Sequence, residues 1–165
     1  MPLSNRIAIC PGSYDPVTNG HVDILERAAE MFDEVIVAVV DLPVRKGGTL
    51  FTAEERLGFL DGCTGHLSNV RSQAFSNLVV DFAREVGAKA IVKGLRSISD
   101  FSYEFEMYAL NQRLAPEIES VYLMASPQYS FLSSSGVKEL ATFGGDIQDL
   151  VPDGVSERLQ EALAR

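Results

Sequence analysis

Apolar and polar positions along the chain follow two alternating periods, which predicts a regular succession of strands and helices. Apolar runs of strand length lie at residues 6–10, 34–40, 88–93 and 120–124, with a weaker one near Val70. Short, β-branched runs of this kind are typical of strands buried on both faces of a parallel sheet. The first segment between runs, residues 20–32, places four apolar side chains on one helical face: Val22, Leu25, Ala29 and Phe32.

Capping residues and breakers set the ends of the other predicted helices. Thr52 and Glu55 form a capping box that starts a helix ending near Gly62. Ser76 is the predicted cap of the next helix, whose apolar residues are Leu78, Phe82 and Val86. Three further helices are expected at residues 99–114 (before Pro116), 134–142 and 156–164.

Strands that alternate with helices imply right-handed crossovers and an α/β fold. We therefore predict a single-domain, Rossmann-like, open parallel five-stranded sheet with helices on both faces and a helical C-terminus. Without a linker or repeat, residues 1–165 form one expected domain. Ligands of such sheets bind at the carboxyl ends of the strands, where every motif discussed below falls.

A Thr-Asn-Gly-His segment, residues 18–21, follows the first predicted strand and a turn at residues 11–16. It opens a helix, so backbone N–H groups and the positive end of the helix dipole are presented to an anion. Gly20 permits close approach of a ligand to the backbone. This arrangement predicts a phosphate site and, with His21, an enzyme that handles a nucleoside triphosphate.

The charge and composition of the chain limit the classes of molecule that it is expected to bind. The chain carries 14 Lys and Arg against 23 Asp and Glu, a net charge of −9 that opposes nucleic-acid binding. Basic residues for a small anionic substrate must be gathered locally, as at Arg45-Lys46 and between Lys93 and Arg96. No apolar run has membrane-span length and no secretory leader is recognised, so no membrane partner is expected. Two cysteines without metal spacing, Cys10 and Cys63, favour reduced thiols in the cytoplasm.

Neither a P-loop nor a dinucleotide fingerprint follows the first strand. Residues 11–21 instead resemble the T/H-x-G-H signature of the nucleotidylyltransferase superfamily. Residues 93–104 and 129–135 narrow the resemblance to the bacterial phosphopantetheine adenylyltransferase family. The resemblance implies transfer of the adenylyl group of ATP to 4′-phosphopantetheine, which gives 3′-dephospho-coenzyme A and pyrophosphate without a covalent enzyme intermediate.

The same resemblance assigns roles residue by residue. It implies that catalysis depends on His21, as a hydrogen-bond donor that stabilises the transition state, together with Ser13 and Arg96. The expected ATP contacts are Ser13, Tyr14, His21, Gly94, Leu95, Arg96, Glu104, Tyr129, Ser130, Phe131, Leu132, Ser133, Ser134 and Ser135. The expected contacts to the phosphopantetheine are Ser13, Val79, Lys93 and a cation of the Arg45-Lys46 pair. Direct counting favours Arg45 for that cation, and a one-residue shift favours Lys46.

The resemblance also implies Mg²⁺, held mainly by the ATP phosphates because no carboxylates cluster to hold an ion. Asp15, before Pro16, is expected to form an Asx turn rather than to bind metal. A homohexamer is expected by resemblance alone. Three alternatives stay open: a sister nucleotidylyltransferase with another acceptor, a nucleotide-binding module without chemistry, and an interaction or scaffold protein.

Overall fold

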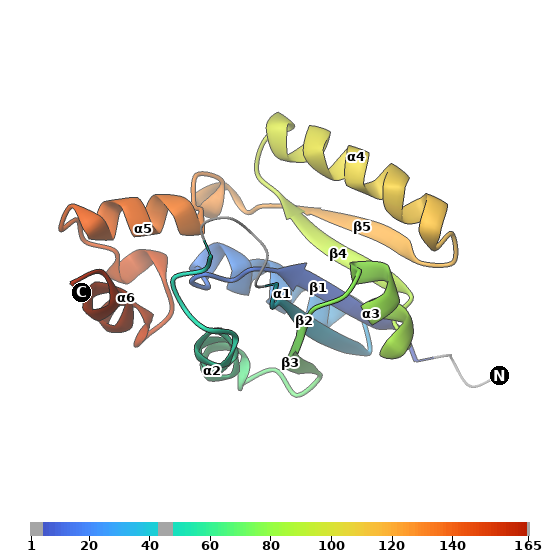
Figure 1. The fold of residues 1–165 in the computed structure, drawn as a ribbon, viewed down its shortest axis with the longest axis horizontal. Coiled ribbons are helices and arrows are strands. Elements are labelled where there is room, and N and C mark those ends of the chain that lie inside the picture. The colour runs from blue at the N-terminus through green and yellow to red at the C-terminus, as the bar shows by residue number, and fades with distance from the viewer. Residues whose placement is uncertain (1–4, 43–47, 165) are drawn as a thin grey trace.

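Five parallel strands form one sheet in the order β3-β2-β1-β4-β5 (Figure 1). The computed structural model describes residues 5–42 and 48–164. The strands are β1 (Ile7–Gly12), β2 (Glu34–Val40), β3 (Val70–Phe75), β4 (Ala90–Leu95) and β5 (Glu119–Met124). The predicted parallel sheet is confirmed, including the weak third strand, which pairs along its whole length with β2.

The chain order reverses between β1 and β4, and the two strands separate there. Ala8 pairs with Ala90 and Ile9 with Ile91, although both strands continue beyond these residues. The pairs of β1 with β2 run on to Gly12 and Val39. A crevice therefore opens between the carboxyl ends of β1 and β4, at the position where open α/β sheets bind ligands.

In the part of the chain that the structure describes, six α-helices connect or follow the strands. They are α1 (Asn19–Met31), α2 (Ala53–Thr64), α3 (Val79–Glu85), α4 (Ile98–Leu114), α5 (Ser134–Thr142) and α6 (Val155–Leu163). Two 3₁₀ turns, η1 (Pro127–Tyr129) and η2 (Gln148–Leu150), lie before and after α5. In the described part of the chain, no helix is both long and apolar enough to cross a membrane.

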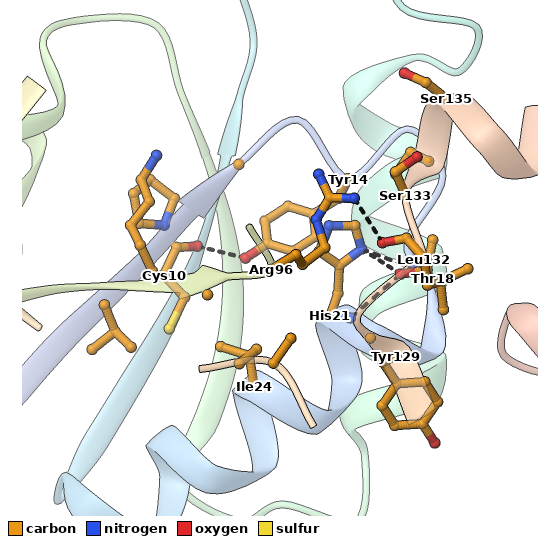
Figure 2. A pocket seen from close by; sticks show the side chains of 18 residues that line it. Cys10, Tyr14, Thr18, His21, Ile24, Arg96, Tyr129, Leu132, Ser133 and Ser135 are labelled. Atoms are coloured by element: carbon orange, nitrogen blue, oxygen red, sulfur yellow. Dashed lines mark hydrogen bonds between the residues drawn. The ribbon is translucent and has the colours of Figure 1, made fainter. Parts of the chain in front are cut away.

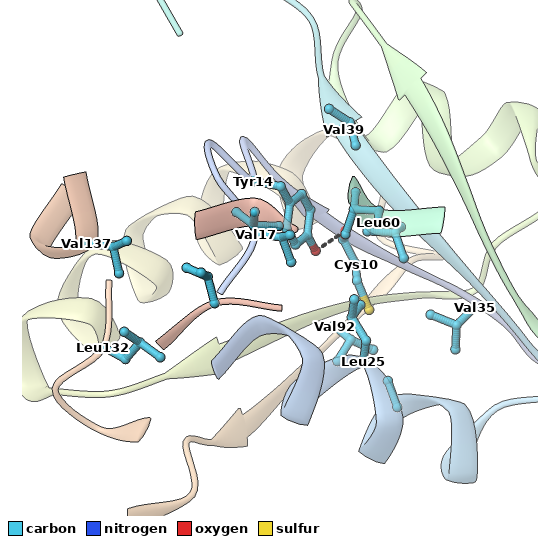
Figure 3. Packing of buried hydrophobic residues seen from close by; sticks show 14 of the residues in the cluster. Cys10, Tyr14, Val17, Leu25, Val35, Val39, Leu60, Val92, Leu132 and Val137 are labelled. Atoms are coloured by element: carbon cyan, nitrogen blue, oxygen red, sulfur yellow. Dashed lines mark hydrogen bonds between the residues drawn. The ribbon is translucent and has the colours of Figure 1, made fainter. Parts of the chain in front are cut away.

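Strand residues alternate between two buried clusters, one on each face of the sheet. On β1, Cys10 belongs to the cluster that also contains Leu25 of α1 and Leu60 of α2 (Figure 3). The neighbouring residue, Ile9, faces the opposite cluster with Phe82 of α3. The C-terminal helices α5 and α6 add to the first cluster. Because a buried cluster lies on each face of the sheet, the first strand is apolar on both faces.

Two local predictions about helix starts have different outcomes. The Thr52–Glu55 capping box is present, with Glu55 N–H donating to Thr52 Oγ1 at 3.2 Å and Thr52 N–H to Glu55 Oε2 at 3.0 Å. The predicted cap at Ser76 is wrong, because α3 begins only at Val79, with Leu78 in extended conformation as its N-cap. Leu78 is consequently 56% exposed instead of lying on the buried face.

The helix α4 packs unlike the others. None of its 17 residues is buried, and Ile98, Phe101 and Phe105 expose more than half of their surfaces. Figure 1 shows α4 along the β4–β5 side of the sheet, at the outer edge of the molecule. A helix with apolar side chains in this position presents a large apolar surface to solvent.

Candidate active site

The turn after β1 folds tightly back over the end of its own strand. Tyr14 has a left-handed backbone, with φ 49°, and its hydroxyl donates to the carbonyl of Cys10 at 2.8 Å. A Cβ on Gly12 would lie 3.0 Å from the Tyr14 ring, so a side chain there would displace the ring. The turn therefore brings Ser13 and Tyr14 to the crevice between β1 and β4.

The histidine of the first motif closes the N-terminus of α1. Thr18 is the N-cap, and its Oγ1 accepts the N–H of His21 at 3.4 Å. In return, the N–H of Thr18 donates to Nδ1 of His21 at 3.0 Å. Because Nδ1 is an acceptor in this reciprocal cap, a neutral ring carries its proton on Nε2, on the other side of the imidazole.

The imidazole is kept neutral by its surroundings. Burial and, to a smaller extent, the nearby positive charge of Arg96 together lower the pKa of His21 from 6.5 to about 4. Figure 2 shows the Arg96 guanidinium beside the His21 ring. His21 is therefore a fixed neutral donor through Nε2 at neutral pH, suited to a phosphate oxygen that gains negative charge.

A cavity of about 330 Å³ occupies the crevice in front of this ring. Its walls come from the turn after β1, the first turn of α1, the end of β4 and the start of α5. The residues from the predicted ATP set that line it are Tyr14, His21, Gly94, Arg96, Tyr129, Leu132, Ser133, Ser134 and Ser135. The sequence-predicted blocks, far apart along the chain, thus meet in one cavity.

The start of α5 is fastened to the turn after β1. Ser134 donates from Oγ to the carbonyl of Pro16 at 2.7 Å, and Ser133 caps the helix by accepting the N–H of Gly136 at 3.0 Å. Arg96 reaches across from β4 and donates to the carbonyl of Leu132 at 3.3 Å. Two helix N-termini, those of α1 and α5, therefore face the same cavity. Their positive dipole ends favour binding of a polyanion there.

Five residues of the predicted ATP set do not line this cavity. Leu95 is 5% exposed within β4, and Phe131 is 70% exposed on the outer side of its loop. Ser130 bonds the carbonyl of Pro127 at 3.0 Å. Ser13 and Glu104 line a second cavity instead.

The second cavity, of about 440 Å³, lies between the end of β1, α3 and α4. It contains three residues of the predicted phosphopantetheine set, Ser13, Val79 and Lys93. Most of its remaining wall is apolar or amide: Leu42, Phe75, Leu78, Val80, Ile91, Tyr103, Met107, Asn111, Leu114 and Tyr122. Such a wall suits an elongated ligand with methyl and amide groups. Arg45 and Lys46, the other members of that set, lie outside the described residues.

Lys93 stands where the two cavities meet. Pro11, Gly12 and Lys93 line both of them. The Lys93 ammonium lies 3.1 Å from Oε1 of Glu104, whose side chain is 14% exposed. Glu104 therefore contacts the cation between the cavities, and sequence reasoning, which placed it beside the nucleotide, did not find this partner.

The structure contradicts a second expectation, that Asp15 forms an Asx turn. Its carboxylate is 4% exposed, and its hydrogen bonds go to distant residues instead of to the expected Asx turn. It accepts the N–H groups of Leu50 and Phe51, each at 2.9 Å, and lies 3.0 Å from the Lys138 ammonium. These partners are distant along the chain, so no local sequence signal identifies them. Among the described residues, no three His, Cys, Asp or Glu side chains gather closely enough to hold a metal ion.

Several residues of the ATP-side cavity carried no separate signal in the sequence. Cys10, Val92 and Ile24 are ordinary apolar positions in their elements, Ala125 directly follows β5, and all four line the cavity that opens where β1 and β4 diverge. Gly94 leaves space for Ile24, since a Cβ there would lie 3.0 Å from Ile24 Cγ1. Only the tertiary arrangement distinguishes these positions from the core.

Comparison with known sequences gives a consistent picture. The profile of a family described as cytidylyltransferase-like matches residues 9–140. A phosphopantetheine adenylyltransferase of Heliobacterium modesticaldum is 53% identical over 155 residues, which cover 94% of this chain and 91% of the relative. The enzyme of the same name from Caldanaerobacter subterraneus subsp. tengcongensis is 50% identical over 160 residues, covering 97% and 99%.

Solved structures share the fold at much lower identity. A Vibrio parahaemolyticus protein assigned as a nicotinate-nucleotide adenylyltransferase superposes with a TM-score of 0.73 at 20% identity, covering 98% of this chain and 96% of the other. A bifunctional NMN adenylyltransferase/ADP ribose pyrophosphatase of Francisella tularensis gives 0.73 at 14% identity, covering 98% and 50%. At this level of identity the likeness concerns the fold alone.

Proposed function

The chain belongs to the phosphopantetheine adenylyltransferase family, and from that premise we propose that it transfers the adenylyl group of ATP to 4′-phosphopantetheine. The products are 3′-dephospho-coenzyme A and pyrophosphate, a step of coenzyme A biosynthesis. The observation that carries this conclusion is the pair of cavities that meet at Pro11, Gly12 and Lys93. One is lined by phosphate-binding groups and the other by apolar and amide groups, as the two substrates require.

In the proposed reaction, the ATP triphosphate lies between the N-termini of α1 and α5. A phosphate oxygen of phosphopantetheine attacks the α-phosphorus, a P–O bond forms, and the bond to the β-phosphate oxygen breaks. Pyrophosphate leaves with the electron pair of that bond. No group on the protein is adenylylated, so the chain acts by positioning and by stabilising charge.

Each site residue has a proposed part in that step. Nε2–H of His21 donates to an α-phosphate oxygen as negative charge builds up there, and Arg96 binds phosphate oxygens with its planar fork. Lys93, between the cavities, holds the acceptor phosphate against the α-phosphate. The Ser13 hydroxyl, beside the shared residues Pro11 and Gly12, donates to the phosphates at their meeting point.

We propose that Mg²⁺ enters with ATP and is held by phosphate oxygens and water. The groups that line the ATP-side cavity are an imidazole, two cations and serine hydroxyls, a donor set that suits phosphate better than a hard cation. When bound, the ion neutralises charge on the triphosphate. We also propose a cytoplasmic location, since Cys10 and Cys63 are both free thiols, and action of the chain as one domain.

A homohexamer is proposed from the family and is supported by α4. Ile98 is 85% exposed and Phe105 60% exposed, although both are apolar, and a second copy of the chain is the proposed cover. Sedimentation should give the mass of six chains, and Phe105→Glu should give a smaller species. Phe143→Glu, at an 84% exposed ring on the segment after α5, is the matched control and should leave the α4 contact intact.

The function is tested by pyrophosphate release from ATP with 4′-phosphopantetheine as acceptor. Nicotinate mononucleotide and glycerol 3-phosphate serve as alternative acceptors in the same assay. We expect release with phosphopantetheine and background rates with the others. Faster turnover of either alternative acceptor would identify a sister nucleotidylyltransferase, and ATP binding without any release would identify a binding module.

A further inference from the structure

A guanidinium is buried beneath the turn that joins β1 to α1. Arg56, in the first half of α2, is 2% exposed and is the bulkiest side chain buried to this extent. Burying a charge is costly unless polar partners replace its hydration, and an apolar side chain of similar size is often more stable in such a place. The proposed mechanism above makes no use of this residue.

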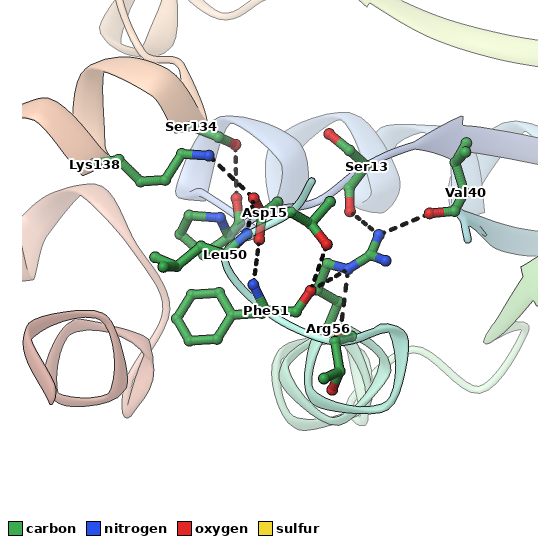
Figure 4. A network of polar contacts seen from close by, with 11 residues as sticks. Ser13, Asp15, Val40, Leu50, Phe51, Arg56, Ser134 and Lys138 are labelled. Atoms are coloured by element: carbon green, nitrogen blue, oxygen red, sulfur yellow. Dashed lines mark hydrogen bonds and ion pairs between the residues drawn. The ribbon is translucent and has the colours of Figure 1, made fainter. Parts of the chain in front are cut away.

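The partners of Arg56 are backbone carbonyls of the turn after β1, of the end of β2 and of the start of α2 (Figure 4). Its Nη1 donates to the carbonyl of Ser13 at 2.7 Å and to that of Val40 at 2.9 Å. Its Nε donates to the carbonyls of Phe51 and Thr52 at 3.2 and 3.3 Å. One planar fork therefore fixes the turn after β1, the last residue of β2 and the start of α2 relative to one another.

The same region is held from the other side by Asp15. The peptide N–H of Phe51 donates to Asp15 while its carbonyl accepts from Arg56, so this residue is clamped by both charged groups. The Asp15 carboxylate pairs with Lys138, and within residues 5–42 and 48–164 no carboxylate lies within ion-pair distance of Arg56. Two cations thus accompany one carboxylate under the turn, in a chain whose net charge is −9.

We propose that Arg56 is a positioning residue for adenylyl transfer. It holds the backbone of Ser13, which lines the second cavity and follows Gly12, where the two cavities meet. Its charge also adds positive potential beneath the phosphates of both substrates. Arg56 lines neither cavity, so it acts through Ser13 and through the field and does not touch the reacting atoms. This inference rests on the function proposed above.

Two substitutions remove the planar fork, one together with the charge and one without it. Arg56→Gln keeps an amide donor but removes both the charge and the planar fork. Arg56→Lys keeps the charge but loses the planar fork. We expect kcat to fall roughly 10- to 100-fold in both, because small displacements of reacting groups have effects of this size. In Arg56→Lys, which keeps the charge, the KM for ATP should stay within about twofold of the wild-type value, since the walls of the ATP-side cavity are unchanged.

The matched control lies one helical turn further along α2. Leu60 is fully buried like Arg56, but its side chain is a hydrocarbon and holds no strand end by hydrogen bonds. Of Leu60→Val and Leu60→Ala, the control is the variant whose fall in Tm matches that of the Arg56 variants. This control should keep kcat within about threefold of wild type. An equal fall in kcat in the control would reduce Arg56 to a stability residue and overturn the proposal.

A second readout is independent of the reaction. Amide hydrogen exchange at Ser13 and Tyr14 should be faster in the Arg56 variants than in the Leu60 control of equal stability. If wild type releases no pyrophosphate but this difference is present, the proposed function fails and the positioning of the turn stands. If wild type is active and both Arg56 variants keep its kcat, the Arg56 inference fails alone. Failure of both variants to fold would also overturn it.

Discussion

The backbone N–H of Thr18 donates a hydrogen bond to Nδ1 of His21 across 3.0 Å. This contact assigns the proton of the neutral imidazole to Nε2 and orients the ring at the start of α1. The ring also meets Tyr14 edge to face, with centroids 5.0 Å apart. Cap, stacking and burial together make His21 a preorganised donor.

The ionisation of His21 is directly measurable. Since the chain has two histidines, His66→Gln leaves His21 as the sole imidazole for nitrogen NMR. We expect a neutral ring protonated on Nε2 at pH 5.5 and a titration midpoint at about 4. A midpoint near the ordinary value of 6.5 would contradict the neutral-donor role.

The same shift predicts how stability depends on pH. The folded-state pKa of His21 lies below its ordinary value of 6.5, so protonation favours the unfolded chain. The stabilising contribution of the neutral ring is complete above about pH 6.5 and is lost as the pH falls toward 4. The free energy of unfolding, measured in urea, should therefore fall more steeply over this interval in wild type than in His21→Asn. Parallel curves would show that the ring does not have a lowered pKa.

Removal of the His21 donor should act on kcat. His21→Ala is expected to lower kcat about 10²–10³-fold, the usual effect of losing one such donor, with a smaller change in the KM for ATP. His66→Ala is the control, because that ring lies outside both cavities and pairs with Glu26 at 2.9 Å. Undiminished turnover of His21→Ala would contradict the mechanism.

Two glycines give a matched pair of substitutions. Gly94→Ala places a Cβ 3.0 Å from Cγ1 of Ile24, and both residues line the ATP-side cavity. We expect a roughly tenfold higher KM for ATP, since crowding of this kind costs about 1–3 kcal/mol. Gly58→Ala on α2, where a Cβ meets nothing within 4 Å, should instead stabilise the fold by about 0.5–1 kcal/mol. Thermal unfolding and ATP titrations check both results.

The contact between Glu104 and Lys93 separates two assignments for this carboxylate. If Glu104 positions Lys93, Glu104→Gln should raise the KM for phosphopantetheine roughly tenfold and leave that for ATP nearly unchanged. Glu106→Gln, an exposed position on the same helix, is the control. A selective rise in the KM for ATP would instead support the nucleotide contact expected from the sequence.

Two single substitutions show whether Arg45 or Lys46 binds the phosphate of the acceptor. Arg45→Ala and Lys46→Ala should differ, with only one of them raising the KM for phosphopantetheine by about tenfold or more. Steady-state kinetics with varied phosphopantetheine measure this difference. If neither value changes, the assignment of this role to the Arg45-Lys46 pair is wrong.

The sequence by itself determined the elements and the edge of the sheet where the site lies. Strand runs, the Thr52–Glu55 cap and the alternation of strands with helices depend on local hydrogen bonding and on apolar periodicity, which neighbouring residues fix. Parallel strands bring their carboxyl ends together, so the blocks at His21, Lys93 and Ser134 had to meet.

Tertiary structure alone decided where individual side chains point within that edge. The Asp15 carboxylate accepts hydrogen bonds from the N–H groups of Leu50 and Phe51, 35 and 36 residues away, instead of from its own turn. Glu104 forms an ion pair with Lys93. Phe131 is exposed and lies outside the ATP-side cavity, which its neighbour Leu132 lines. Loop directions and buried charge pairs depend on which distant groups share a low-dielectric space, and neither residue type nor spacing encodes that choice locally.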